Sequence, residues 1–600
     1  MLFIEKLDQP SCADFPPLFE PLESRVMLTT AHPSVTDVTP KNGATNVARN
    51  IFIACDVHLV GSGLGVDPRF LKGNVTLTQT SNNKSVAGDV NTSGGGDTIV
   101  FTPSAILASN TKYTFKVTTS VKDDGGNSFN AFTSTFTTGT AGGTVNSKIA
   151  FDKVSLPSPT GHNFTAVVVG PDHRLYVGDQ GGDIFRYDIN ANGTLTNMLS
   201  IQTLKSHNGG SRTLIGMAFD PASTKTNPIL WVSNGVPSNN ATGAADWTGK
   251  ISKLSGANLQ NYQDEVTGLP RSFQDHQTEQ MSFGPDGALY ISQGSMTAMG
   301  APDAAWGNRT EHLLSAAILR LDTKKLGTTP LNVKTKEGGG TYNPFAATAP
   351  LTIYADGVRN SYDLVWTHDG FLFSSTNGSA KGGNTPAGKA PFSGTRIDQA
   401  TKGPYTGPAV PALTNVPAQS DYLYNIVKGG YYGHPNPLRG EYVENGGNPT
   451  AGVDKGEVAQ YPVGTKPDRN YRGFAWDLGK FESPDGAIEY KGNAFGGALN
   501  GSLMIAQYSG GDNIVVLSRS GSKITGAVEN YTGLTGYNDP LDLAEDLTTG
   551  NIYVAEWGGQ RITLLRPHVT TPAPAVAKAT AAQSVFSTKP TGDSLASQVL

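Results

Sequence analysis

Residues 281–292 read MSFGPDGALYIS, an apolar strand, a Gly-Pro-Asp-Gly turn and a second strand of apolar and aromatic residues. Similar units recur between residues 150 and 568. Residues 167–177 read VVVGPDHRLYV, residues 217–221 read MAFDP, and residues 364–373 read LVWTHDGFLF. Two further copies begin at Leu503 and Asp542, so the chain carries six repeats.

Each repeat predicts one small antiparallel sheet, which cannot bury both of its faces alone. Radial stacking of such sheets around an axis buries the faces and leaves only short edges. The repeats therefore predict a six-bladed β-propeller over residues 151–568. Long insertions at 293–315 and 374–480 are expected to form its binding face, because insertions in repeat folds gather on one side.

Residues 31–140 have a different pattern of strands. Segments such as VTLT at 75–78 and YTFKV at 113–117 alternate polar and apolar residues, as half-buried strands do. About seven such strands in roughly 110 residues predict a β-sandwich. Residues 141–150, rich in Gly and Thr, are expected to be a linker. The predicted fold class is all-β, a sandwich followed by a propeller.

Composition excludes several classes of protein. Gly accounts for 72 of 600 residues, only 16% of residues are charged, and the formal net charge is −5. A nucleic-acid-binding surface needs many basic residues, and a coiled coil needs many charged positions. The chain has no apolar run long enough to predict a membrane span. Its two cysteines can form neither a disulfide framework nor a thiolate zinc site.

The two ends of the chain are expected to lie outside the folded domains. Residues 19–28, FEPLESRVML, contain a Leu-Glu-x-Arg motif. This motif resembles a head found on large extracellular proteins of some bacteria, and implies that residues 1–30 are an export or surface-association segment. An extracellular or cell-surface location is therefore expected. Residues 569–600, rich in Ala, Thr, Ser and Pro, are expected to be disordered.

The predicted sandwich resembles the bacterial Ig-like module of surface-layer and other multidomain extracellular proteins. The resemblance rests on TPKNGATNVARN at 39–50 and STFTTG at 134–139. It implies a spacer or adhesion unit, which contacts cell-surface components and carries no catalytic residues.

The propeller resembles the soluble glucose and sorbosone dehydrogenases, whose cofactor is pyrroloquinoline quinone with calcium. The resemblance rests chiefly on DHQTEQMSFGPDGALYISQGS at 275–295 and YADGVRNSYDLVWTHDG at 354–370. It implies an aldose dehydrogenase, which transfers a hydride from the anomeric carbon of a sugar or polysaccharide to the quinone.

The same resemblance implies the site residues. His276 lies where the family has its base, a role that suits a group with an ordinary pKa near ~6.5. Arg359 and Asn360 lie at the family's Arg-Asn pair, which contacts quinone and substrate oxygens. Trp306, in the long loop of the third repeat, is expected to stack on the sugar ring. No metal ligands can be assigned.

Three departures from the family pattern concern charge. The family has a Lys where this chain has Ser509, and an Arg-x-Arg where it has Asp539 and Leu541. The quinone carries three carboxylates, so its site needs cations. Two alternatives therefore stand beside the dehydrogenase. One is a non-catalytic propeller that binds carbohydrate or protein, and the other is a calcium-dependent propeller hydrolase.

Two weaker metal hypotheses come from the loops. His162, His207 and His434 lie beside Gly or Asn, and Asp179 and Asp183 flank a Gly-rich segment. A blade turn is the simpler interpretation of the Asp179–Asp183 segment.

Overall fold

The structure is a computed structural model that describes residues 32–61, 65–93, 95–140, 149–238, 243–388, 394–396 and 407–568. The predicted head at 1–30 and tail at 569–600 lie outside the described residues, as does most of the linker. Apart from short 3-10 turns, the described chain has one helix, α1 (Thr203–Asn208). No helix within these ranges is long and apolar enough to cross a membrane.

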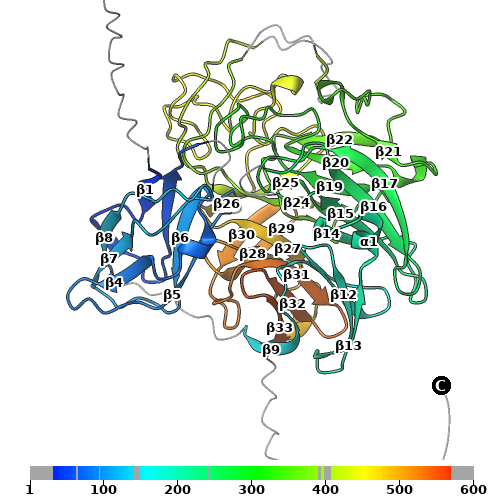
Figure 1. The fold of residues 1–600 in the computed structure, drawn as a ribbon, viewed down its shortest axis with the longest axis horizontal. Coiled ribbons are helices and arrows are strands. Elements are labelled where there is room, and N and C mark those ends of the chain that lie inside the picture. Colours follow the sequence, from blue (N-terminus) through cyan, green and yellow to red (C-terminus); the bar gives the residue numbers. More distant parts are fainter. Residues whose placement is uncertain are drawn as a thin grey trace, which may run out of the picture.

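The N-terminal domain is a sandwich of two four-stranded sheets (Figure 1). In spatial order, one sheet contains β1 (Ser34–Thr39), β3 (Ile53–His58), β6 (Thr98–Pro103) and β5 (Gly88–Thr92), and the other contains β2 (Ala44–Val47), β8 (Phe132–Thr138), β7 (Lys112–Val117) and β4 (Val75–Gln79). Their inner faces share one apolar core, in which Leu77 and Phe115 are fully buried. The alternation that predicted a sandwich is therefore explained by this core.

The C-terminal domain contains six sheets in chain order, which are the blades of a propeller. Blades 1 to 3 comprise β10 (Phe164–Val169), β11 (Arg174–Asp179), β12 (Ile184–Ile189) and β13 (Leu195–Ile201); β14 (Thr213–Phe219), β15 (Ile229–Gly235), β16 (Gly249–Ser255), β17 (Asn261–Leu269) and β21 (Leu331–Asn332); and β18 (Thr278–Phe283), β19 (Leu289–Gln293), β20 (Ala317–Leu321) and β22 (Leu351–Asp356).

Blades 4 to 6 complete the ring. They comprise β23 (Leu364–Trp366), β24 (Leu372–Thr376), β25 (Asp421–Ile426) and β26 (Trp476–Gly479); β27 (Pro484–Glu489), β28 (Leu503–Gln507), β29 (Asn513–Ser520) and β30 (Lys523–Val528); and β31 (Pro540–Asp546), β32 (Asn551–Glu556), β33 (Arg561–Pro567) and β9 (Phe151–Thr160). The first strands of the six blades contact one another in cyclic order, with β10 beside β31. The predicted fold class is confirmed.

The ring is closed by a strand from the start of the domain. Strand β9 pairs with β33 antiparallel, from Phe151 opposite Pro567 to Thr160 opposite Arg561. The first segment of the propeller therefore supplies the outer strand of its last blade. Phe151 is 2% exposed and its ring packs edge-on against Tyr490 and Phe495, in a core shared by blades 5 and 6.

Buried side chains also join neighbouring inner strands near the axis. Asp542 of blade 6 accepts a hydrogen bond from the Val167 amide of blade 1 at 2.7 Å. Asp363, next to blade 4, accepts one from Ala487 of blade 5 at 2.8 Å. These bonds satisfy amides that face the adjacent blade rather than a strand of their own sheet.

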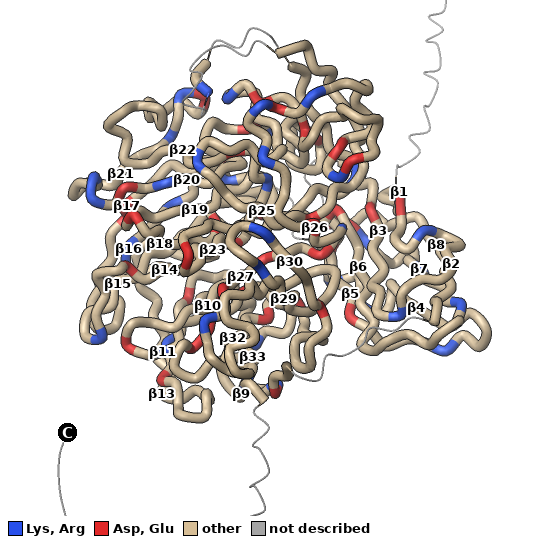
Figure 2. Tube along the Cα trace, turned by 180° about the vertical axis from the view of Figure 1, so that it is seen from behind, with Lys and Arg blue, Asp and Glu red and all other residues tan. Residues whose placement is uncertain are grey.

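The Ig-like domain lies beside the propeller, with β5 and β6 nearest to it (Figure 1). Seen from the opposite side, acidic and basic residues are interspersed along the described parts of both domains, without the basic stripe that nucleic-acid binding requires (Figure 2).

Replacing Phe151 with Ala tests the closure of the ring. Loss of a buried aromatic side chain costs about 3–5 kcal/mol, so we expect a clearly lower urea midpoint of the propeller transition. The matched control is Asp152→Ala on the same strand, whose side chain is 54% exposed. An equal midpoint for both variants would contradict closure through β9.

Candidate functional site

A cavity of about 440 Å³ lies where the inner strands of the propeller begin. We call it the chamber. Its propeller wall includes Thr165, Ile215, Gln274, Asp275, His276, Glu279, Trp306, Arg359, Asn360, Tyr362, Asn377, Gln419, Asp421, Asp485, Tyr508, Ser509, Asp539 and Leu541. This volume is in the range of small-molecule sites. Trp306 and Gln419 come from the two long insertions that were expected to form a binding face.

The other wall of the chamber comes from the Ig-like domain, chiefly the loop between β5 and β6. Asn91, Ser93, Gly95, Gly96 and Asp97 line it. A Cβ on Gly95 would lie 3.3 Å from Cζ2 of Trp306, so the loop backbone approaches that ring closely. The Ig-like domain therefore contributes to the wall of the chamber, beyond the predicted role of a spacer or adhesion unit.

The Ig-like domain contacts loops of blades 4, 5 and 6. Asn91 donates a short hydrogen bond to the Asp539 carboxylate. On another side, the Lys381 amide donates to Asp56 at 3.1 Å. A Cβ on Gly510 would lie 2.8 Å from the Phe52 ring, so this ring packs directly on the Gly510 backbone.

His276 is held in the chamber wall by a buried arginine. Arg271 donates hydrogen bonds to the carbonyls of Gln274 at 2.6 Å and His276 at 3.0 Å. Nδ1 of His276 lies 3.2 Å from the carbonyl oxygen of Ser295 and 3.0 Å from its hydroxyl. Because a carbonyl can only accept, Nδ1 is assigned the proton and Nε2 is left with a lone pair. Burial, and then the charge of Arg359, lower the His276 pKa well below its ordinary value.

Arg359 and Asn360 stand beside His276. Arg359 donates to the carbonyls of Ala298 at 2.9 Å and Gly378 at 3.1 Å, which fixes it between loops of blades 3 and 4. At Gly294 a Cβ would meet Asn360 Oδ1 at 2.7 Å and His276 Cβ at 2.8 Å. Glycine at this position therefore allows His276 and Asn360 to line one wall together.

Trp306 is buried rather than exposed on an overhanging loop. It is 2% exposed, and its ring centroid lies 4.2 Å from that of His276. The Arg359 guanidinium lies 5.5 Å from the same ring. Asp303 accepts from the Trp306 amide at 3.0 Å and holds the loop in place. The indole thus packs on protein groups and also lines the chamber, and its stacking on a sugar stays a prediction.

The positions where the family pattern has cations also line the chamber. Ser509, Asp539 and Leu541 all face it. Among the described lining residues there are seven carboxyl groups, those of Asp97, Asp124, Asp275, Glu279, Asp421, Asp485 and Asp539, and Arg359 is the single Lys or Arg. Burial raises the pKa of Asp275, Glu279 and Asp485, and raises that of Asp421 to about 6.

Several acceptor atoms in the chamber wall have no hydrogen-bond partner among the described residues. They are the side-chain oxygens Oδ1 of Asn91, Asp275, Asn360 and Asn377 and the hydroxyl of Ser509. Buried polar atoms in native proteins are almost always paired. These atoms therefore call for hydrogen-bond donors that a ligand or water would supply.

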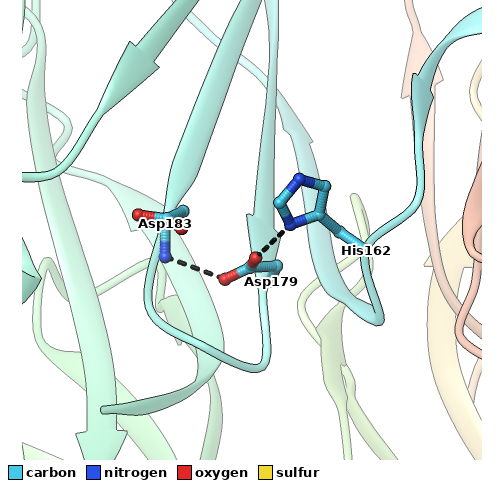
Figure 3. A group of neighbouring side chains, drawn as sticks. All are labelled: His162, Asp179 and Asp183. Carbon is cyan, nitrogen blue, oxygen red and sulfur yellow. Dashed lines mark hydrogen bonds and ion pairs between the residues drawn. The ribbon is translucent and has the colours of Figure 1, made fainter. Parts of the chain in front are cut away.

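The metal hypotheses from the sequence receive little support. His162 Nδ1 lies 2.7 Å from Asp179, and Asp183 meets Asp179 through its backbone amide rather than its carboxylate (Figure 3). The Asp183 carboxylate pairs with Lys205 at 3.0 Å. His162, Asp179 and Asp183 therefore belong to a blade turn in which Lys205 supplies the positive charge. His434 pairs with Glu311, and His207 stacks on Tyr262, so the three loop histidines do not converge.

Within the described ranges, two groups bring three metal-ligating atoms close together. One comprises His162, Asp179 and Asp183, and the other comprises His368, Asp369 and Glu489. None of these residues lines the chamber. No chamber residue within the described ranges belongs to such a compact group of three.

Sequence reasoning missed the residues that the Ig-like domain contributes. Asn91 and Asp97 lie in an ordinary hairpin, and no local pattern marks them as part of a site. It also missed the buried carboxyls Asp275 and Asp485, because only the ring brings these separate blades together.

Comparison with known proteins agrees with the domain order. Residues 29–138 match the family described as bacterial Ig-like domain, and this segment is such a domain. No curated protein matches the chain.

Three of the solved structures that resemble the chain are described as sugar dehydrogenases. The quinone-bound aldose sugar dehydrogenase of Streptomyces coelicolor is 16% identical, with a TM-score of 0.43, and the match covers 71% of this chain and 100% of that one. A putative glucose dehydrogenase of Thermus thermophilus is 18% identical, with a TM-score of 0.41 and coverages of 70% and 99%. The quinone domain of pyranose dehydrogenase from Coprinopsis cinerea is 13% identical, with a TM-score of 0.44 and coverages of 69% and 97%.

Asp539 makes the stability of the protein depend on pH. Burial raises its pKa to about 6, against the opposing hydrogen bond from Asn91. The folded state therefore binds this proton more tightly than the unfolded state, whose Asp pKa is about 4. The contribution of Asp539 to the stability of the folded state is fully present below about pH 4 and is lost as pH rises through about 6.

We expect the wild type to lose unfolding free energy as pH rises from about 5 to about 7. In Asp539→Asn this loss is expected to be smaller by roughly 1–3 kcal/mol. The amide keeps the acceptor for Asn91, and Asn tolerates the left-handed backbone at this position, where φ is 52°. Urea unfolding at the two pH values measures the effect. Identical pH dependence in wild type and variant would show that Asp539 is not the titrating group.

Proposed function

We propose that the chamber binds a small polyhydroxylated molecule that is neutral or positively charged, such as a free sugar or amino sugar. The unpaired acceptors in its wall carry this proposal. Asn91, Asn360 and Asn377 each present a side-chain oxygen without a partner, and Asp275 presents another. Sugar hydroxyls and ammonium groups donate hydrogen bonds to such atoms, and a ligand that lacks donors would leave them unpaired.

Pyrroloquinoline quinone does not fit this wall. It brings three carboxylates and few donors into a site with seven carboxyl groups and one arginine. The raised pKa values of Asp275 and Asp485 show that negative charge is already disfavoured there. At about 1.5–3 kcal/mol for each missing charged hydrogen bond, three absent cations would weaken quinone binding by many decades.

Sugar oxidation with another electron acceptor is the second candidate. His276, Arg359 and Asn360 meet on one wall, and the assigned tautomer of His276 leaves Nε2 free to accept a proton. Nε2 could take a hydroxyl proton from a bound sugar, but the lowered pKa of His276 makes it a weak base. Dye reduction by the full chain with glucose tests it, with and without added quinone and calcium. Under the binding proposal, neither condition yields turnover.

An extracellular location supports a role in sugar capture. We propose that the protein acts outside the cytoplasm or at the cell surface, where its partners are sugars, polysaccharide fragments or surface components. The Ig-like domain and the Leu-Glu-x-Arg motif of the head support this location.

Calorimetric titration with three sugars of similar size tests the charge preference of the chamber. We expect glucosamine and glucose to bind at least about tenfold more tightly than glucuronate, since the anion meets carboxyls without cations. We expect no quinone binding at micromolar concentration. Micromolar affinity for the quinone, a preference for glucuronate, or failure of both glucosamine and glucose to bind would overturn the proposal.

Asn360→Leu tests the unpaired acceptors directly. Removing one such acceptor is expected to weaken glucose binding by about tenfold. Asn82→Leu, at an exposed turn of the Ig-like domain away from the chamber, is the matched control and is expected to bind normally.

A further inference from the structure

The contacts of the Ig-like domain are spread around the mouth of the chamber. Gly95 lies over Trp306 of the blade 3 loop, and Asp56 accepts from the Lys381 amide of the blade 4 loop. Asn91 reaches Asp539, just before blade 6. These contacts lie on the loops of blades 3, 4 and 6.

A second cavity lies beside the chamber. A groove of about 560 Å³ runs over the ends of blades 1 and 2, and it shares Gln180, Ile215, Gln274 and Asp275 with the chamber. The rest of its lining includes His162, Ser211, Ser238 and Arg271, all from the propeller. Within the described part of the chain, no Ig-like residue lines this groove, so it offers a lateral way into the chamber.

Asp97, from the Ig-like domain, lines the chamber together with Arg359. Its Oδ1 accepts from the Ser93 hydroxyl, which orients the carboxylate. Burial lowers the Arg359 pKa, and Asp97 is the strongest of the carboxylates that oppose this shift. The unpaired Asn91 Oδ1 lies on the same wall. This wall therefore offers an ammonium group one charged and one neutral acceptor.

We propose that the Ig-like domain is a fixed roof of the binding site, that Asp97 selects ligands bearing an ammonium group, and that ligands enter sideways over blades 1 and 2. The ligand class rests on the proposed function, whereas the roof and the lateral entry do not.

Labelling of a cysteine in the chamber tests the roof without any sugar. Ser509 is 2% exposed and lines the chamber, so Ser509→Cys in a Cys12→Ser background reports access. Cys55 is buried and burial raises its thiol pKa, so it stays unreactive. Ser211→Cys, which is exposed in the groove, is the matched control.

We expect N-ethylmaleimide to label Ser509→Cys. We expect a maleimide bearing a large polymer to label Ser509→Cys at least about tenfold more slowly than it labels Ser211→Cys. We expect Ser211→Trp, added to Ser509→Cys, to slow N-ethylmaleimide by about tenfold, because it obstructs the groove. Equal labelling by both reagents would show that the domain is no roof. Labelling unaffected by Ser211→Trp would show that entry is not lateral.

Asp97→Asn tests the selection of ammonium groups. We expect glucosamine affinity to fall about fivefold to tenfold while glucose affinity changes less than about twofold, because only the charge is removed. Asp37→Asn, on the outer strand β1, is the control. Equal losses for both sugars, or no loss, would overturn the role of Asp97. If neither sugar binds the wild type, the proposed function fails, while the labelling result still decides the roof.

Discussion

The hydrogen bond from the Val167 amide to the Asp542 carboxylate joins the first inner strand to the last, and the pairing of β9 with β33 joins the same two ends of the domain at the rim. The chamber depends on this closure. Its lining residues come from all six blades, up to several hundred residues apart in sequence, and only a closed ring brings them together. The low-dielectric centre of the ring is also the reason why its carboxyl groups have raised pKa values.

The Ig-like domain adds residues that reach the chamber only because the two domains are docked, just as the blades bring theirs together only because the ring is closed. A propeller end is an open surface, and long insertions in blades 3 and 4 cover it only in part. The β5–β6 loop adds the missing cover over Trp306, while Asn91 replaces solvent as the partner of Asp539. Asp539, which lines the chamber, is thus also a contact between the two domains.

Sequence predicted the parts of this protein that depend on local pattern. Period-two strands and repeated turns such as Gly284–Gly287 indicated the sandwich and the six blades, and quoted motifs placed His276, Arg359 and Asn360 on one wall. Asn91 and Asp97 could not be predicted, because their role depends on how two domains dock. The burial of Trp306 was missed for a similar reason: its neighbours His276 and Arg359 lie 30 and 53 residues away in sequence.

A crystal structure of the full chain grown with glucosamine would show the ligand and both domains together. We expect one sugar in the chamber, with its ammonium group near Asp97, its hydroxyls paired with Asn360 and Asn377, and the Ig-like domain in contact with Asp539 and Lys381. A structure with the Ig-like domain detached from Asp539 and Lys381, or with the sugar bound away from the chamber, would contradict this expectation.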